Sequence, residues 1–163
     1  MRVMGVDPGL TRAGFAVVEQ SGGKLKALEF GTVRAAGADV PAQLADLRAR
    51  LAEAVERHRP QAMAVERLFV TRNQRTAIRV GQASAMALLV AAEGGIPVTE
   101  YGPLQVKQAV VGVGSATKDQ VMFMVGRLLG LTEKPETADA SDALALAICH
   151  LHSYRLAVKA GVR

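Results

Sequence analysis

The sequence predicts one α/β domain built on a mixed sheet, and three observations lead to this class. Short apolar runs typical of strands come first in the chain and are separated by turn residues. Longer segments with helical periodicity follow, with two more strand-like runs between them. The 163 residues are 50% hydrophobic and 21% charged, the composition of an ordinary globular domain. A five-stranded mixed sheet with helices on both faces accounts for this order.

The first three predicted strands form an antiparallel meander. Residues 3–6 are a short apolar run that ends at Asp7. Two further β-rich runs cover 14–19 and 25–33, and the Gly-Gly pair at 22–23 indicates a tight turn between them. Short turns of this kind join neighbouring antiparallel strands, so we expect the three strands to lie side by side.

Helices and two strands make up the rest of the chain. Leucines and Val55 lie on one face of 41–58 and charged side chains mostly on the other, which predicts an amphipathic helix. The apolar run 62–65 ends at Glu66 and predicts the fourth strand; 98–101 predicts the fifth. Further helices are expected over 76–93, 103–111, 117–129 and 139–156, with a polar loop over 67–75. We expect a single domain over 1–158 and a short tail over 159–163.

Charge and cysteine content indicate the class of partner and the compartment. The formal charge is +5 and the pI about 9.8, which suits a polyanionic partner such as nucleic acid, although solubility alone would also explain it. Cys149 is the one cysteine and cannot form an intrachain disulfide, as is typical of a reducing cytosol. The first ten residues do not resemble a signal peptide, and the apolar stretches are too short to span a membrane. We therefore expect a cytoplasmic protein with no membrane partner.

Four acidic residues stand where they could form one site. Asp7 and Glu66 each end a predicted strand, and Asp139 and Asp142 share one face of the first turn of the last helix. Taken singly, each has an ordinary interpretation as a turn residue, a surface ion-pair partner or a helix-dipole charge. Together they can converge into a site with oxygen ligands only, which suits Mg²⁺ or Mn²⁺. Two such ions can clamp both the attacking and the leaving oxygen of a phosphodiester.

Four segments, occurring in one order, also carry a resemblance to a known family. They are GVDPGLTR at 5–12, AVERLF at 64–69, QVKQ through GVGSATK at 105–118 and ADASDALA at 138–145. With them the chain resembles the RuvC family of bacterial Holliday-junction resolvases over almost its whole length. The resemblance implies a ribonuclease-H-like fold, a homodimer, and paired Mg²⁺-dependent nicks in opposed strands of a four-way junction that leave 5′-phosphates. It also implies the RuvA–RuvB branch-migration complex as a partner.

The resemblance assigns the four acids to metal binding and catalysis. Asp7, Glu66, Asp139 and Asp142 match the metal-binding positions of the family, so we expect two Mg²⁺ ions per site, with Mn²⁺ able to substitute. Some relatives have a histidine where Asp139 stands. The three histidines of this chain show no zinc-ligand spacing with its cysteine, so a zinc site does not compete with this interpretation.

Five further residues are candidates for DNA binding. Lys107 and Lys118 match family positions associated with DNA binding and catalysis, and Phe69 matches an aromatic associated with the junction. Arg72 and Arg75, and after them Arg79, follow Phe69 in and after the loop, and nearby arginines can hold phosphates while a base stacks on an exposed aromatic ring. The residues alone leave open that the lysines are merely solvated and that the aromatic ring packs into the core.

The helix expected over 76–93 bears on assembly because apolar residues occupy nearly its whole circumference. A helix of this kind is buried on every side, either inside the monomer or against a partner. Gly81 and Ala85 would allow a symmetric mate to approach closely. A two-fold assembly also suits two nicks in a nearly symmetric junction, so we expect a homodimer.

Three other classes of protein fit parts of the pattern. The segment at 7–11 resembles the phosphate loop of actin-like ATP-binding domains, but the chain is too short for two lobes and shows no second such loop. A junction-binding protein without catalysis would explain the basic charge, but not four acids facing DNA. Another ribonuclease-H-like nuclease would fit the acids equally well, and only the aromatic and lysine segments favour the junction.

Overall fold

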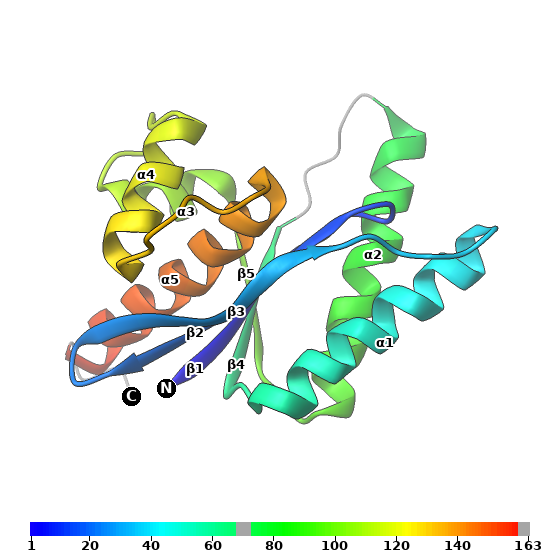
Figure 1. The fold of residues 1–163 in the computed structure, drawn as a ribbon, viewed down its shortest axis with the longest axis horizontal. Helices are drawn as coiled ribbons and strands as arrows, with labels where there is room; N and C mark the ends of the chain where they lie inside the picture. Colours follow the sequence, from blue (N-terminus) through cyan, green and yellow to red (C-terminus); the bar gives the residue numbers. More distant parts are fainter. Residues whose placement is uncertain (68–72, 160–163) are drawn as a thin grey trace.

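A five-stranded mixed sheet forms the centre of the molecule (Figure 1). This computed structural model describes residues 1–67 and 73–159. The strands are β1 (Arg2–Asp7), β2 (Ala13–Ser21), β3 (Lys24–Val33), β4 (Ala62–Glu66) and β5 (Val98–Tyr101). Their order across the sheet is β3-β2-β1-β4-β5, antiparallel within β1–β3 and parallel from β1 through β4 to β5. The predicted meander and the mixed sheet are confirmed.

Helices cover both faces of the sheet. They are α1 (Val40–His58), α2 (Gln74–Glu93), α3 (Pro103–Val111), α4 (Lys118–Leu129) and α5 (Ala138–Lys159). Figure 1 shows α1 and α2 on one side, and α5 with α3 and α4 on the other. The predicted bounds are right to within a few residues. Helix α2 begins two residues before its predicted start because the Asn73 side chain caps it, accepting a hydrogen bond from the Thr76 amide.

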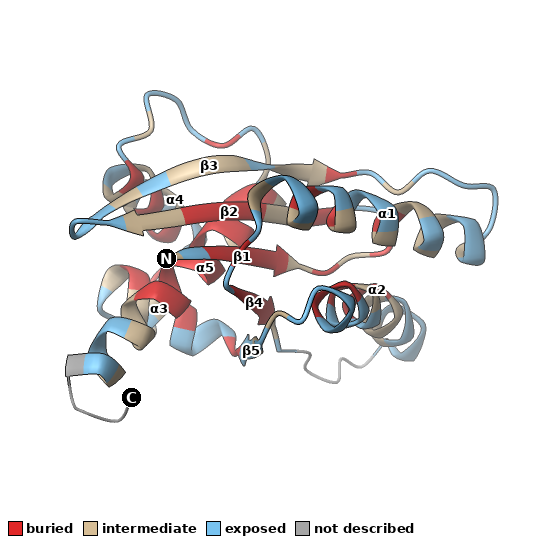
Figure 2. Ribbon diagram, turned by 90° about the horizontal axis from the view of Figure 1, so that it is seen from below, coloured by how far each residue is buried: buried red, intermediate tan, exposed pale blue. Residues whose placement is uncertain are grey.

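Two hydrophobic cores share this sheet, one on each face. Alternate residues of β1 point into different cores: Val3 packs with α5, whereas Met4 and Val6 pack with α1 and α2. Helix α5 is the most buried helix (Figure 2), with every residue from 143 to 149 buried. Because both cores depend on one sheet, a single domain over 1–158 is the simplest organisation, and it stays a prediction. Helix α5 extends one residue into the expected tail, and 160–163 lie outside the described residues.

Two glycines let α5 lie directly on the sheet. A Cβ atom on Gly5 of β1 would be 2.0 Å from the carbonyl oxygen of Ala143, and one on Gly14 of β2 would be 1.9 Å from that of Asp139. Both neighbouring atoms belong to the backbone of α5, so neither can rotate away. The missing side chains therefore set the depth at which the N-terminal half of α5 packs.

The apolar surface of α2 divides into a buried and an exposed face. Ala83, Ala87 and Val90 are buried against the sheet and α1, whereas Ile78 and Leu89 have exposed fractions of 62% and 42%. Burial on every side within the monomer is therefore wrong, and the exposed apolar face is available to a partner. No helix among the described residues has the length and hydropathy needed to cross a bilayer.

Candidate active site

The four predicted acids lie at the ends of β1 and β4 and at the start of α5. Asp7 and Glu66 are the last residues of two neighbouring parallel strands, whose preceding residues Val6 and Val65 are paired. Asp139 is the second residue of α5, whose backbone rests on Gly14. Gly14 is in turn the β2 partner of Asp7, so the close contact brings the start of α5 next to the end of β1.

Asp142 lies one turn further along α5 than Asp139. Asp139 belongs to the first turn, where the helix dipole favours a negative charge, but Asp142 lies beyond it. The prediction that both acids lie in the first turn is therefore right for Asp139 and wrong for Asp142. The two still share one face of the helix because they are three residues apart.

Electrostatic interactions show that the four carboxyl groups form one cluster. Burial, and after it the charges of Glu66, Asp142 and Asp139, raise the pKa of Asp7 to about 7. The hydrogen bond between Asp7 and Glu66 raises the pKa of Asp7 and lowers that of Glu66, the pattern for Asp7 as the donor. Burial likewise raises the pKa of Glu66 and of Asp142. A further cation among the carboxylates would stabilise their ionised forms.

Two cationic side chains contact the cluster from different elements. Arg12 follows β1, and its Nε lies 3.2 Å from Oδ2 of Asp139. That oxygen is buried and accepts no hydrogen bond, so the contact is electrostatic only. Lys118 Nζ lies 3.4 Å from Oδ2 of Asp142, which raises the pKa of Lys118. Arg12 was not singled out from the sequence, because nothing there shows that its side chain turns back toward α5.

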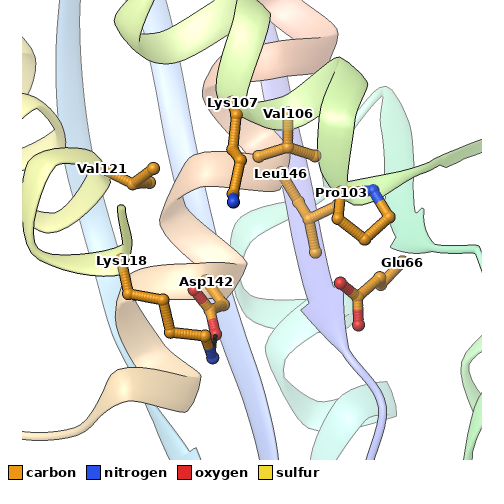
Figure 3. A pocket seen from close by; sticks show the side chains of 8 residues that line it. All are labelled: Glu66, Pro103, Val106, Lys107, Lys118, Val121, Asp142 and Leu146. Carbon is orange, nitrogen blue, oxygen red and sulfur yellow. Dashed lines mark hydrogen bonds and ion pairs between the residues drawn. The ribbon is translucent and has the colours of Figure 1, made fainter. Parts of the chain in front are cut away.

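A small cavity of about 80 Å³ opens beside Glu66 and Asp142 (Figure 3). Lys107 extends toward it from α3, and Lys118, the first residue of α4, lies against Asp142. The other lining residues are apolar: Pro103, Val106, Val121 and Leu146. The two predicted DNA-binding lysines therefore flank the carboxylates, and the apolar lining, which was not predicted, strengthens charge interactions by excluding water.

Of the remaining predicted DNA-binding residues, the structure describes Arg75 alone, which lies at the start of α2. Arg75 is an exposed residue of its first turn. Phe69 and Arg72 lie outside the described residues, so their predicted contacts with DNA stay predictions.

The residues present fit a divalent cation in their chemistry. As the side chains stand, no three of the described histidine, cysteine, aspartate and glutamate residues are placed to hold one ion together. The donor set is nevertheless four carboxylates, which hard cations such as Mg²⁺ prefer. Oδ2 of Asp139 is a buried acceptor without a hydrogen bond, and a cation beside Asp7 would favour its ionised form and oppose its raised pKa. The chemistry of the cluster therefore fits a divalent cation.

Comparisons with known proteins agree on one family. The family model described as crossover junction endodeoxyribonuclease RuvC matches residues 3–150. The protein of that name from Syntrophomonas wolfei is 48% identical over 157 residues, which cover 96% of this chain and 91% of the relative. The one from Frankia casuarinae is 50% identical, covering 93% and 89%.

Comparison with solved structures indicates the same family. Thermus thermophilus RuvC in complex with a Holliday junction substrate aligns with a TM-score of 0.91 and 40% identity over 96% of both chains. A yeast mitochondrial Holliday junction resolvase, at 17% identity, shares the fold with a TM-score of 0.64. The fold is thus the expected ribonuclease-H-like one.

Proposed function

The chain belongs to the RuvC family of crossover junction endodeoxyribonucleases and is a nuclease that resolves Holliday junctions, and we propose how its residues do so. The observation that carries the proposal is the convergence of four carboxylates, in which Asp7 lies within the electrostatic reach of the other three. Asp7, Glu66, Asp139 and Asp142 are the proposed catalytic residues and metal ligands.

Mg²⁺, with two ions per site and Mn²⁺ as a substitute, is the proposed cofactor. Bound there, it supplies a nucleophilic water at neutral pH and stabilises charge on the phosphodiester oxygens. The protein contributes the placement: Asp7 and Glu66 come from adjacent strand ends, and Asp139 and Asp142 from one helix face. Asp7 must give up its proton to become a ligand, so ion binding and deprotonation of Asp7 are linked.

Lys107 and Lys118 hold the strand that is cut. Both line the cavity beside Glu66 and Asp142, and an ammonium group there attracts the phosphate that the carboxylates alone would repel. The contact between Lys118 and Asp142 orients the lysine and neutralises part of the cluster before DNA arrives. The proposed products carry 5′-phosphates.

A homodimer is the proposed assembly, because two opposed strands must be cut. The exposed apolar face of α2, with Ile78, Leu88 and Leu89, offers a surface that can be buried against a second copy. Light scattering at micromolar concentration tests it, and a monomer mass would contradict it. The branch-migration complex RuvA–RuvB is proposed as a partner because the family acts with it.

Cleavage of a labelled four-way junction, with linear duplex as the control, tests the function. The chain and its Asp7→Asn variant are each incubated with Mg²⁺ or with EDTA. We expect paired nicks only for the unsubstituted chain in Mg²⁺, and no cutting of the duplex. Tight junction binding without cleavage in Mg²⁺ or Mn²⁺ would instead indicate a junction-binding protein, and full cleavage in EDTA would exclude the metal mechanism.

A further inference from the structure

A second hollow lies beside Asp139 at the start of α2, which is on the other side of the sheet from the helices α3 and α4 that line the lysine cavity (Figure 1). Its volume is about 450 Å³, and it is lined by the loop between β1 and β2, by the start of α2 and by Asp139 of α5. Its other polar side chains are those of Thr11, Arg12, Thr76 and Arg79. The hollow shares no lining residue with the cavity that Lys107 and Lys118 line. The cluster therefore has a cationic hollow on each side, one with two lysines and one with two arginines.

The arginine hollow carries excess positive charge. Arg12 contacts Asp139, the one acid that lines the hollow. Within residues 1–67 and 73–159, no carboxylate lies within ion-pair distance of Arg79. Helix α2 has no acidic residue in its first turn, so the positive end of its dipole is not neutralised there. Arg75 lies one turn before Arg79 on the same face and extends the positive surface.

Because Arg79 has no carboxylate partner among the described residues and lies beside a cluster of acids, it suits an anionic ligand that extends beyond the cluster. A DNA strand is such a ligand, because its phosphates recur along the strand at about 3.4 Å of helix axis per nucleotide. A strand whose scissile phosphate lies at the carboxylates has neighbouring phosphates on both sides. The lysine cavity is placed to meet those on one side, and the arginine hollow those on the other.

We propose that Arg79 and Arg12 form a phosphate-binding subsite for the strand being cut, on the side of the scissile phosphate opposite to the lysines. The proposal rests on the proposed function and adds to it a direction: the strand crosses the cluster from the lysine cavity to the arginine hollow. Arg79 is a binding residue of this subsite, and Arg12 belongs to both the subsite and the surroundings of Asp139.

The salt dependence of junction binding tests the subsite. Arg79→Gln is compared with Arg50→Gln, which removes an exposed arginine of α1 that pairs with Asp46. Both are made in an Asp7→Asn background, so that the junction stays uncut in Mg²⁺, and light scattering confirms that their masses agree. We expect Arg79→Gln to lower the slope of log affinity against log salt by about 1, the value for one lost phosphate contact, and Arg50→Gln to leave it unchanged.

Single neutral methylphosphonates, placed in turn at the phosphates on either side of the cut, then identify the contact. We expect a neutral linkage on either side of the cut to weaken binding of the Asp7→Asn protein. On one of the two sides, this loss should disappear when the protein also carries Arg79→Gln. Lys107→Gln should cancel the effect on the other side instead. The subsite would be overturned if the Arg79 and Arg50 variants had equal slopes of log affinity against log salt. It would also be overturned if each neutral linkage lowered the binding affinity equally with and without Arg79. Failure of the unsubstituted chain to cut the unmodified junction would count against the proposed function instead.

Discussion

Replacing Gly14 with alanine should displace α5 and slow junction cleavage without unfolding the protein. The new Cβ would lie 1.9 Å from the carbonyl oxygen of Asp139 and 2.4 Å from its carbonyl carbon. An ordinary non-bonded contact is about 3.5 Å, so the backbone of one element must retreat by about 1.5 Å. Asp139 moves with its own backbone. A misplacement of about 1 Å at a catalytic site can slow a reaction by about 10²-fold.

The stability of the same variant should change far less than its activity. Overpacking of this kind destabilises a folded protein by about 1–3 kcal/mol, which leaves a cooperative melting transition at a lower temperature. Gly31→Ala is the matched control in β3, because its Cβ would lie at an ordinary 3.6 Å from Cε1 of Phe15. Single-turnover cleavage and thermal melting of both variants check the reasoning. A Gly14→Ala protein that cuts at the normal rate would refute the claim that this contact positions Asp139.

Three further predictions concern charge and assembly. In EDTA and at a pH above 7, Asp7→Asn should increase the free energy of unfolding by about 0.5–2 kcal/mol. Its melting temperature should therefore be higher than that of the unsubstituted chain. The native protein binds more protons than the unfolded chain between pH 3.8 and about 7, so the destabilisation by Asp7 is complete above pH 7 and disappears toward pH 4. Lys118→Gln should change stability by less than about 1 kcal/mol, because the lysine is exposed, yet slow single-turnover cleavage; unchanged cleavage would remove Lys118 from the mechanism. Leu89→Glu should give a monomer by light scattering, whereas Leu104→Glu, also exposed but on α3, should not; a dimer in both would place the interface elsewhere.

The sheet and the acidic residues could be predicted because their signals are local. The strands β1 and β4 are each a short apolar run that ends in an acid, and their parallel pairing places Asp7 and Glu66 side by side. The helix that carries Asp139 and Asp142 is equally clear from its apolar sequence. The catalytic roles of these residues stay predictions until cleavage is measured.

The parts that could not be predicted depend on contacts between distant segments. Arg12 contacts Asp139 only because the loop after β1 folds back over the start of α5. The close packing at Gly14 brings together residues more than a hundred positions apart, and an ordinary strand glycine gives no sign of it. Which face of α2 is exposed depends on where the sheet lies, because the helix is apolar nearly all round.

The position of α5 in the chain has a consequence for synthesis of the protein. Helix α5 is the last element described, and it packs against β1, β2, β3 and β4. During translation, β1–β3 and β4 are therefore synthesised before Asp139 and Asp142. The nuclease site would be completed only when the final helix docks, so a nascent or prematurely ended chain should carry Asp7 and Glu66 but be unable to cut DNA. Late docking would thus keep an unfinished nuclease harmless to the chromosome.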